Sequence, residues 1–221
     1  MELFLDTANA QAVAELSKVL TIAGVTTNPT IITKSSKTAK QVFDEMNAVL
    51  APEQKMFLQT VATDFDGIMD EARYICGLRE NMYVKIPVTP TGLQAIKVAK
   101  QEGLKVLATA IYSADEAFFA AMNGADYLAP YLNRMCNLGD GIQQVSDLIE
   151  MLDNNGLDSK VCAASFKNGL QVHELIRLGA QAATVPPAVI WTMVKNPNTQ
   201  IAVDEFTVAW KETFGRTTFA E

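Results

Sequence analysis

The sequence predicts an α/β protein of the (β/α)₈ TIM barrel class, with an extra C-terminal helix. Short runs of apolar and β-branched residues recur along the chain, amphipathic patterns separate them, and the runs number eight. Parallel strands need a crossover between them, so eightfold alternation of strand and helix favours a closed barrel. A doubly wound open sheet is the runner-up. No Gly-x-Gly-x-x-Gly follows the first run, so the dinucleotide-binding form of that sheet has little support.

The expected strands are short, as is usual for strands that are buried on both faces. In order they span residues 2–6, 23–27, 56–61, 82–87, 104–110, 125–131, 160–165 and 182–186. The intervals leave room for one helix or, early in the chain, two. Helical spacing of apolar residues is clear in two of them, at Val13, Leu16 and Leu20, and at Ile142, Val145, Ile149 and Leu152.

A final amphipathic helix is expected in the segment 198–221, beyond what a barrel needs. Its apolar residues lie three or four positions apart, and Gly215 is a suitable end: Val203, Phe206, Trp210 and Phe214. This apolar stripe could cap the barrel or pack against a neighbouring subunit.

Length and composition indicate one domain over residues 1–221. A chain of 221 residues with 49% hydrophobic residues can bury a large core, and no linker or low-complexity segment divides it. The formal charge of −7 and the lack of a basic run argue against nucleic acid or an anionic membrane as the main partner. Any anion site must therefore be local.

The N-terminal residues lack a basic leader, and no apolar stretch approaches membrane-spanning length, so we expect a soluble, cytoplasmic protein. The three cysteines, Cys76, Cys136 and Cys162, match no metal-ligand spacing and suit reduced thiols. With His173 as the only histidine, a multi-histidine metal site is impossible, and we expect this side chain to be solvated on a helix.

Polar side chains occur at or near the carboxyl ends of seven expected strands, where barrels carry their chemistry. They are Asp6, Thr26, Thr27, Asn28, Gln59, Lys85, Thr109, Tyr131 and Ser165. Singly, each has a structural explanation: Asp6 could cap a helix, Asn28 with Pro29 could form a turn, and Thr109 could be an ordinary strand residue. Jointly they are better explained by one site at the mouth of the barrel.

Lys85 lies within the apolar run Met82-Tyr83-Val84-Lys85-Ile86-Pro87. Burial disfavours the ammonium and lowers the pKa of a lysine, which leaves a neutral amine able to attack a carbonyl and form a Schiff base. A lysine at a strand end whose amine reaches water is the structural alternative.

Four segments resemble the signatures of the transaldolase family, specifically its short fructose-6-phosphate aldolase branch. They are Val25-Thr26-Thr27-Asn28-Pro29-Thr30, Val84-Lys85-Ile86-Pro87, Ala129-Pro130-Tyr131-Leu132-Asn133-Arg134 and Ala163-Ala164-Ser165-Phe166-Lys167. The resemblance runs from end to end and includes the closing Phe214-Gly215-Arg216-Thr217. It implies a class I aldolase in which Lys85 forms the imine without metal or other cofactor.

The resemblance also implies roles for other residues. Gln59, Thr109 and Tyr131 would hold a water that shuttles protons, with Tyr131 as the acid/base partner. Asp6, Asn28 and Thr26 would lie at the substrate hydroxyls, and Asp6 could stabilise the cationic iminium. The substrate phosphate would be bound by Arg134, Ser165 and Lys167.

Gln59 and Tyr131 bear on the activity within the family, because transaldolases proper usually have Glu and Phe at these positions. An amide cannot carry the proton that a carboxylate carries, whereas a tyrosine hydroxyl can. This favours cleavage of fructose 6-phosphate to dihydroxyacetone and glyceraldehyde 3-phosphate over transfer of the dihydroxyacetone unit to erythrose 4-phosphate.

Other interpretations are a phosphosugar-binding barrel without turnover and a redox protein that uses Cys136 or Cys76. The intact Lys85 disfavours the first. As for assembly, the resemblance implies a homo-oligomer, a decamer of two stacked pentameric rings in which the C-terminal helix reaches a neighbour.

Overall fold

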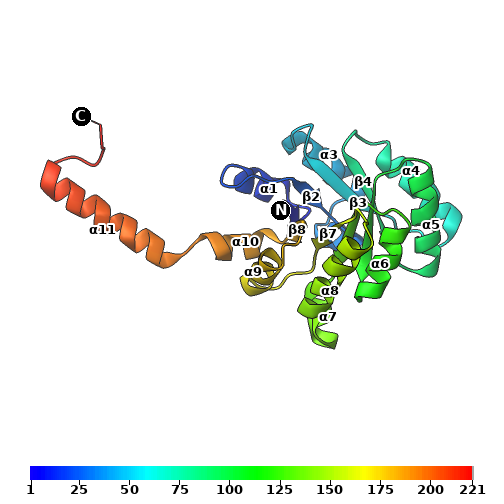
Figure 1. Cartoon of the computed structure of the whole chain (residues 1–221). Helices are drawn as coiled ribbons and strands as arrows, with labels where there is room; N and C mark the ends of the chain where they lie inside the picture. Colours follow the sequence, from blue (N-terminus) through cyan, green and yellow to red (C-terminus); the bar gives the residue numbers. More distant parts are fainter. Residues whose placement is uncertain (221) are drawn as a thin grey trace.

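Eight parallel strands form a closed barrel in the computed structural model, which describes residues 1–220 (Figure 1). The strands are β1 (Glu2–Asp6), β2 (Gly24–Thr26), β3 (Lys55–Gln59), β4 (Met82–Pro87), β5 (Val106–Ile111), β6 (Tyr127–Pro130), β7 (Lys160–Ala163) and β8 (Ala182–Val185). Each strand pairs with its sequence neighbours, and β1 closes the barrel against β8. The predicted barrel is confirmed, and each expected run agrees with its strand to within two residues at either end.

Helices follow every strand and surround the barrel. They are α1 (Ala10–Ser17), α2 (Pro29–Lys34), α3 (Ala39–Val49), α4 (Phe65–Cys76), α5 (Pro90–Gln101), α6 (Ala114–Met122), α7 (Leu132–Leu138), α8 (Gly141–Asn154), α9 (Gly169–Arg177), α10 (Pro187–Val194) and α11 (Pro197–Phe214). The early pair predicted from the intervals is α2 and α3. A second pair, α7 and α8, lies between β6 and β7, where the sequence did not indicate one.

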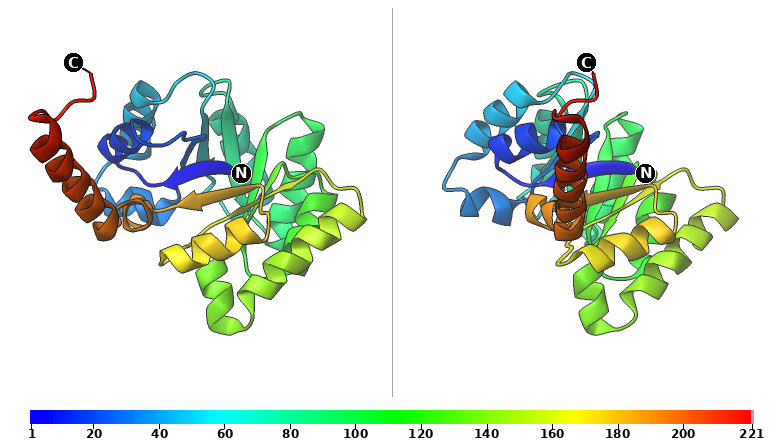
Figure 2. Two further views of the ribbon diagram at one scale, coloured as in Figure 1. Left: turned by 60° about the vertical axis from the view of Figure 1, so that its left-hand side comes forward. Right: turned by 90° about the vertical axis from the view of Figure 1, so that its left-hand side faces the viewer.

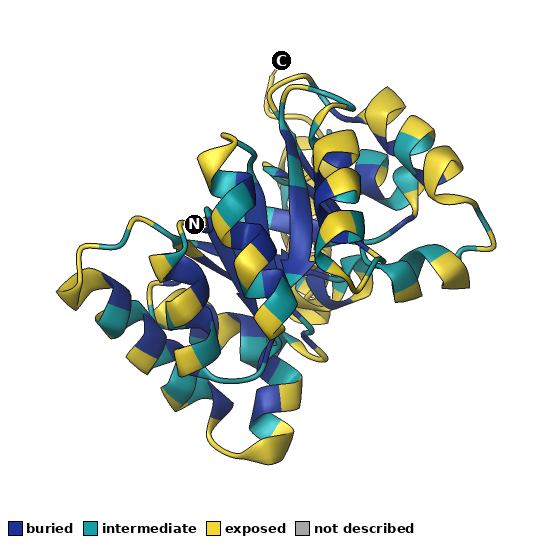
Figure 3. Cartoon of the chain, turned by 90° about the vertical axis from the view of Figure 1, so that its right-hand side faces the viewer, coloured by how far each residue is buried: buried dark blue, intermediate teal, exposed yellow. Residues whose placement is uncertain are grey.

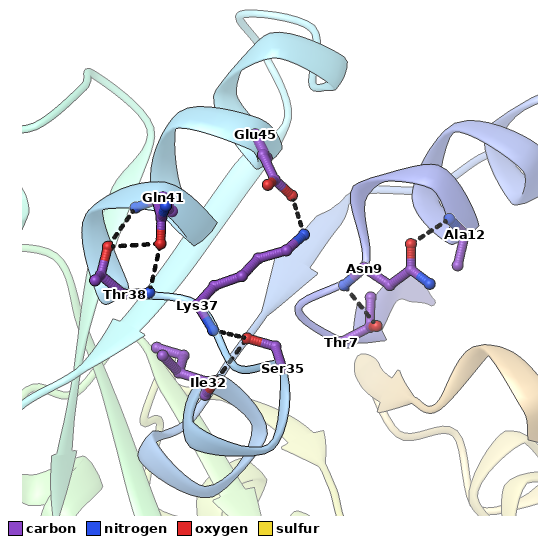
Figure 4. A network of polar contacts seen from close by, with 9 residues as sticks. All are labelled: Thr7, Asn9, Ala12, Ile32, Ser35, Lys37, Thr38, Gln41 and Glu45. Atoms are coloured by element: carbon purple, nitrogen blue, oxygen red, sulfur yellow. Dashed lines mark hydrogen bonds and ion pairs between the residues drawn. The ribbon is translucent and has the colours of Figure 1, made fainter.

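Side-chain caps fix where helices begin at the side of the barrel where the carboxyl ends of the strands lie. Asn9 accepts from the backbone N–H of Ala12 at the start of α1, and Thr38 forms a reciprocal capping box with Gln41 at the start of α3 (Figure 4). In the same network, the ammonium of Lys37 bonds Glu45 at 2.5 Å. These contacts position the connections that follow β1 and β2.

Two apolar clusters form the core, one inside the barrel and one between the barrel and its helices. Colouring by burial shows buried strands beneath helices whose outer faces are exposed (Figure 3). The interior cluster includes Phe4, Phe57 and Leu107, with Tyr83 packed against it. Because side chains alternate along a strand, Phe4 and Tyr83 share inward faces with Asp6 and Lys85, two residues nearer the carboxyl ends. The interior apolar cluster therefore lies directly beneath the polar side chains at the carboxyl ends of the strands.

Helix α11 stands away from the barrel, as two further views show (Figure 2). None of its residues is buried, and Phe206 is 71% exposed. Gly215 ends the helix as predicted, with a left-handed φ of 68° that favours glycine. Of the two expectations for this helix, capping the barrel is wrong for this chain. Within residues 1–220, no helix combines the length and hydrophobicity needed to span a bilayer.

Candidate active site at the carboxyl ends of the strands

A cavity of about 390 Å³ opens at the carboxyl ends of the strands. Eight of the residues predicted for the site line it: Asp6, Asn28, Gln59, Lys85, Tyr131, Arg134, Ser165 and Lys167. The other three, Thr26, Thr27 and Thr109, are fully buried and do not line it. Thr26 was expected to meet substrate. Its hydroxyl instead bonds Asp6, so Thr26 can act on a substrate only through that carboxyl.

Lys85 brings its amine into this cavity from the interior of β4. The residue is 2% exposed, and its Nζ donates to the backbone carbonyl of Thr27 at 2.9 Å. Burial lowers the pKa of Lys85, while the nearby Asp6 opposes that shift. The amine does not reach bulk water, which excludes the alternative of a solvated lysine at a strand end.

Asp6 ends β1 and faces the same cavity. Burial raises the pKa of its carboxyl, while Lys85 and the hydrogen bond from Thr26 oppose that shift. Asn9, not Asp6, caps helix α1, so the structural explanation considered for Asp6 does not hold. Burial therefore favours the neutral forms of both Asp6 and Lys85. The attraction between the two groups has the opposite effect, because the charge on one stabilises the charged form of the other.

Asn28 has two functions in this structure. Its Oδ1 accepts from the backbone N–H of Ile31 and caps α2, with Pro29 at the first turn. Since the cap occupies Oδ1, the group that Asn28 offers to the cavity is its amide N–H₂. Asn28 is therefore part of the turn with Pro29 and also lines the cavity, and its contact with a substrate hydroxyl stays a prediction.

Gln59 and Tyr131 line the cavity, and Thr109 contacts Tyr131. Oε1 of Gln59 is buried without a hydrogen-bond partner, which identifies it as an acceptor for a donor that a ligand or water would bring. Thr109 donates its hydroxyl to the phenol oxygen of Tyr131 at 3.2 Å. Burial raises the pKa of Tyr131, partly opposed by Thr109 and Arg134, so the phenol keeps its proton at neutral pH.

Arg134 and Lys167 bring local positive charge to the cavity, which Ser165 also lines. The guanidinium of Arg134 lies 5.0 Å from the ring centre of Tyr131. Ser165 has a left-handed φ of 65°, a strained conformation for a residue with a side chain, at the turn from β7 towards α9. The wall offers cations to an anionic group although the whole chain is acidic.

The sequence did not indicate Tyr112, which lines the cavity at the end of β5. Its hydroxyl accepts from Nη1 of Arg134 at 2.6 Å, and its ring packs edge-on against Tyr131 with centroids 5.8 Å apart. The strand was expected to end at residue 110, and the register with β6 shifts between Ala108 and Ile111. Ala110 takes a φ of 57° in this irregularity, so the period-two alternation of strand side chains cannot be extended past it to Tyr112.

The remaining chemical candidates lie elsewhere. None of the cysteines lines the cavity, and burial raises the pKa of the Cys76 thiol, which makes a redox nucleophile there less favourable. His173 is exposed on α9, as predicted. In the described part of the chain, no three His, Cys, Asp or Glu side chains are gathered in a way that could hold a metal ion.

Comparison with known proteins agrees with this geometry. The family model described as transaldolase/fructose-6-phosphate aldolase matches residues 3–218. One similar solved structure is a cube-shaped, highly porous protein cage designed by fusing symmetric oligomeric domains, with a TM-score of 0.52 and 19% identity. That match covers 83% of this chain and 62% of the cage chain, and at this identity it shows the fold alone. Because the family match covers nearly the whole chain, this protein belongs to the transaldolase/fructose-6-phosphate aldolase family.

Proposed function

We propose that this protein is a class I aldolase that reversibly cleaves fructose 6-phosphate to dihydroxyacetone and glyceraldehyde 3-phosphate through an imine on Lys85. The observation that carries the proposal is the amine of Lys85, 2% exposed, in a cavity lined also by Asp6, Gln59 and Tyr131. A buried amine with a lowered pKa is a nucleophile for a ketone carbon.

The reaction follows from these groups. Nζ of Lys85 attacks C2 of the ketose, and the C2 oxygen leaves as water to give an iminium. The C3–C4 bond then breaks as the C4 hydroxyl loses its proton, and the bond electrons pass to the iminium. Tyr131, which accepts a hydrogen bond from Thr109, gives and takes these protons through a water bound by Gln59. After glyceraldehyde 3-phosphate leaves, C3 is protonated, and water releases dihydroxyacetone and the free amine.

The charged groups divide the cavity between the two ends of the substrate. Asp6 lies near Lys85 and stabilises the cationic iminium, and the amide of Asn28 donates to a substrate hydroxyl. Arg134 and Lys167, with the backbone at Ser165, bind the phosphate. A phosphorylated ketose fits both the amine and the two cations.

Gln59 and Tyr131 support cleavage rather than transfer. A glutamine does not supply the carboxylate that transaldolases proper use at this position, and of Gln59 and Tyr131 only the phenol of Tyr131 can titrate. Dihydroxyacetone is then released to water without a second sugar as acceptor.

Reductive trapping tests the proposal. The protein is incubated with fructose 6-phosphate or dihydroxyacetone, reduced with borohydride and mapped by mass spectrometry. We expect one adduct, on Lys85, and none in Lys85→Met. Cleavage is then assayed with and without erythrose 4-phosphate. An adduct on another residue overturns the mechanism, binding without any adduct indicates a non-catalytic phosphosugar barrel, and strict dependence on the acceptor indicates a transaldolase.

The protein is also proposed to work as a homo-oligomer, a decamer of two pentameric rings by resemblance to the short branch. Helix α11 supports an assembly of this kind, because its apolar residues are exposed and stand away from the chain's own barrel (Figure 2). Contact with a neighbouring copy would cover them.

A further inference from the structure

We propose that Thr184 is a positioning residue for the reaction: with Thr26 it forms a chain of two buried hydroxyls that holds Asp6 as a carboxylate opposite the lysine iminium. The inference rests on the proposed function, because it concerns the same site. It adds a residue from β8, a strand that contributes no predicted site residue.

The two hydroxyls and the carboxyl of Asp6 lie within hydrogen-bond distance of one another in series, and the hydroxyls are buried. Oγ1 of Thr26 lies 2.8 Å from Oδ1 of Asp6 and 2.6 Å from Oγ1 of Thr184. Thr26 is 0% and Thr184 1% exposed, and neither lines the cavity. Strands β8 and β2 flank β1 on either side, so two inward hydroxyls meet behind the carboxyl that β1 presents.

Proton counting gives the chain a direction. A threonine hydroxyl has one proton to donate, and while Asp6 is ionised its oxygen can only accept. Thr26 must then donate to Asp6, and Thr184 must donate to Thr26. If Asp6 takes up a proton, the chain can reverse, with Asp6 donating to Thr26 and Thr26 to Thr184. The direction of both hydroxyls is therefore tied to the charge on Asp6.

This direction has a consequence for the chemistry. A hydroxyl that itself accepts a hydrogen bond is a better donor, so Thr184 strengthens the bond from Thr26 to the carboxylate. Burial raises the pKa of Asp6, and the hydrogen bond from Thr26 acts against that shift. The other titratable groups that interact electrostatically with Asp6 are Lys85 from β4, Tyr131 after β6 and Cys162 in β7.

The position is otherwise suited to an apolar residue. Ala182, Ala183 and Val185 complete β8, and all are buried. A hydroxyl inside such a strand costs free energy unless it is hydrogen-bonded, and in this structure Thr184 bonds Thr26.

The test compares Thr184→Val, which keeps the shape and removes the hydroxyl, with Thr184→Ser, which keeps it. The aldol addition of dihydroxyacetone to unphosphorylated glyceraldehyde is followed against pH, so that no substrate phosphate titrates. In the iminium the lysine nitrogen is no longer a titrating amine, so the acid limb of kcat reports Asp6. We expect T184V to move this limb up by about 0.1–0.7 pH unit, because the hydrogen bond from Thr26 to the carboxylate remains but loses about 10–30% of its strength, and T184S to restore it.

Controls separate this role from a structural one. Thr60→Val removes another buried threonine hydroxyl, which bonds the backbone of Lys85 at 3.4 Å, and should leave the limb in place. A lower kcat in T184V with an unmoved limb, or an equal shift in T60V, overturns the inference. If T184V does not fold, Thr184→Ala replaces it with the same two outcomes. Wild-type protein without a trapped adduct on Lys85 would instead overturn the proposed function.

Discussion

At the residue scale, the site depends on two buried groups of opposite charge whose ionisation is opposed by the same environment. Lys85 and Asp6 both lose solvation in the barrel mouth, and each is the other's electrostatic partner. A lysine with a lowered pKa provides neutral amine at a pH where an exposed lysine is protonated. In the proposed mechanism, the carboxylate stabilises the iminium, in which the nitrogen carries a fixed positive charge.

Asp6→Asn separates the effect of Asp6 on the pKa of Lys85 from its effect on the iminium. Without the carboxylate, the ammonium of Lys85 loses its counter-charge, so its pKa should fall further and the acid limb of imine trapping by cyanoborohydride should move to lower pH. At the same time kcat should fall by about 10²–10³-fold, because the iminium loses its stabilisation. Mapping the trapped adduct at each pH checks both. A limb that stays in place or moves to higher pH would contradict the assigned coupling.

Tyr112→Phe tests the contact between Tyr112 and Arg134. Loss of the hydroxyl that accepts from Arg134 should loosen the guanidinium and raise KM for fructose 6-phosphate about three- to tenfold. Arg134→Ala should raise it more. Both should leave KM for unphosphorylated analogues nearly unchanged. The matched control is Tyr74→Phe, on an exposed tyrosine of α4. Equal effects on both substrate classes would remove Tyr112 and Arg134 from the phosphate wall.

At the element scale, α11 is the part of the chain that its own barrel does not explain. Apolar side chains along 18 residues are exposed, including Ile201 at 55% and Phe206 at 71%. The ring of Trp210 packs on Phe214 with centroids 4.5 Å apart and on Phe219 of the tail with centroids 5.8 Å apart, so the helix and its tail have local contacts of their own. None of its residues lines the candidate active site.

Truncation before Asn198 should reduce the oligomeric mass, because it removes the apolar helix proposed to contact a neighbour. Light scattering coupled to size exclusion measures the mass, with 24.0 kDa for the full-length chain as the reference for a monomer. On the full chain, Phe206→Ser should act in the same direction, and Glu205→Ser, on the same helix, should not. An unchanged mass in the truncated protein would exclude α11 from the interface.

At the scale of the whole molecule, charged groups also close the end of the barrel opposite to the site. Glu2 at the start of β1 bonds Lys55 at 2.9 Å and Lys160 at 3.0 Å, and it accepts a short hydrogen bond from Tyr127. Burial raises the pKa of Glu2, but the bonds from Tyr127, Lys55 and Lys160 outweigh it and lower the pKa to about 2. These contacts join β1 to β3, β6 and β7.

Glu2→Gln should therefore reduce the free energy of unfolding by about 1–2 kcal/mol at pH 7. This figure allows for the partial exposure of Glu2 and its lysine partners to solvent. A lowered carboxyl pKa contributes stability above its ordinary value of 4.5, and this contribution is lost as pH falls towards about 2. In guanidinium unfolding, the difference in free energy of unfolding between the wild type and Glu2→Gln should become smaller as the pH falls over that interval. The exposed Glu53→Gln serves as control. A difference that is independent of pH would assign the effect to packing rather than charge.

The sequence by itself determined the barrel, because strand and helix periods are local properties and eight alternations leave few closed arrangements. It also predicted eight of the residues that line the cavity at the mouth, since the carboxyl ends of parallel strands must lie on one side. The tertiary structure alone decided the rest. The register shift after Ala108 brought Tyr112 into the cavity, and closure of β8 against β1 brought Thr184 to Thr26 across 158 positions of sequence. Such contacts depend on side-chain distances between strands that no sequence period specifies.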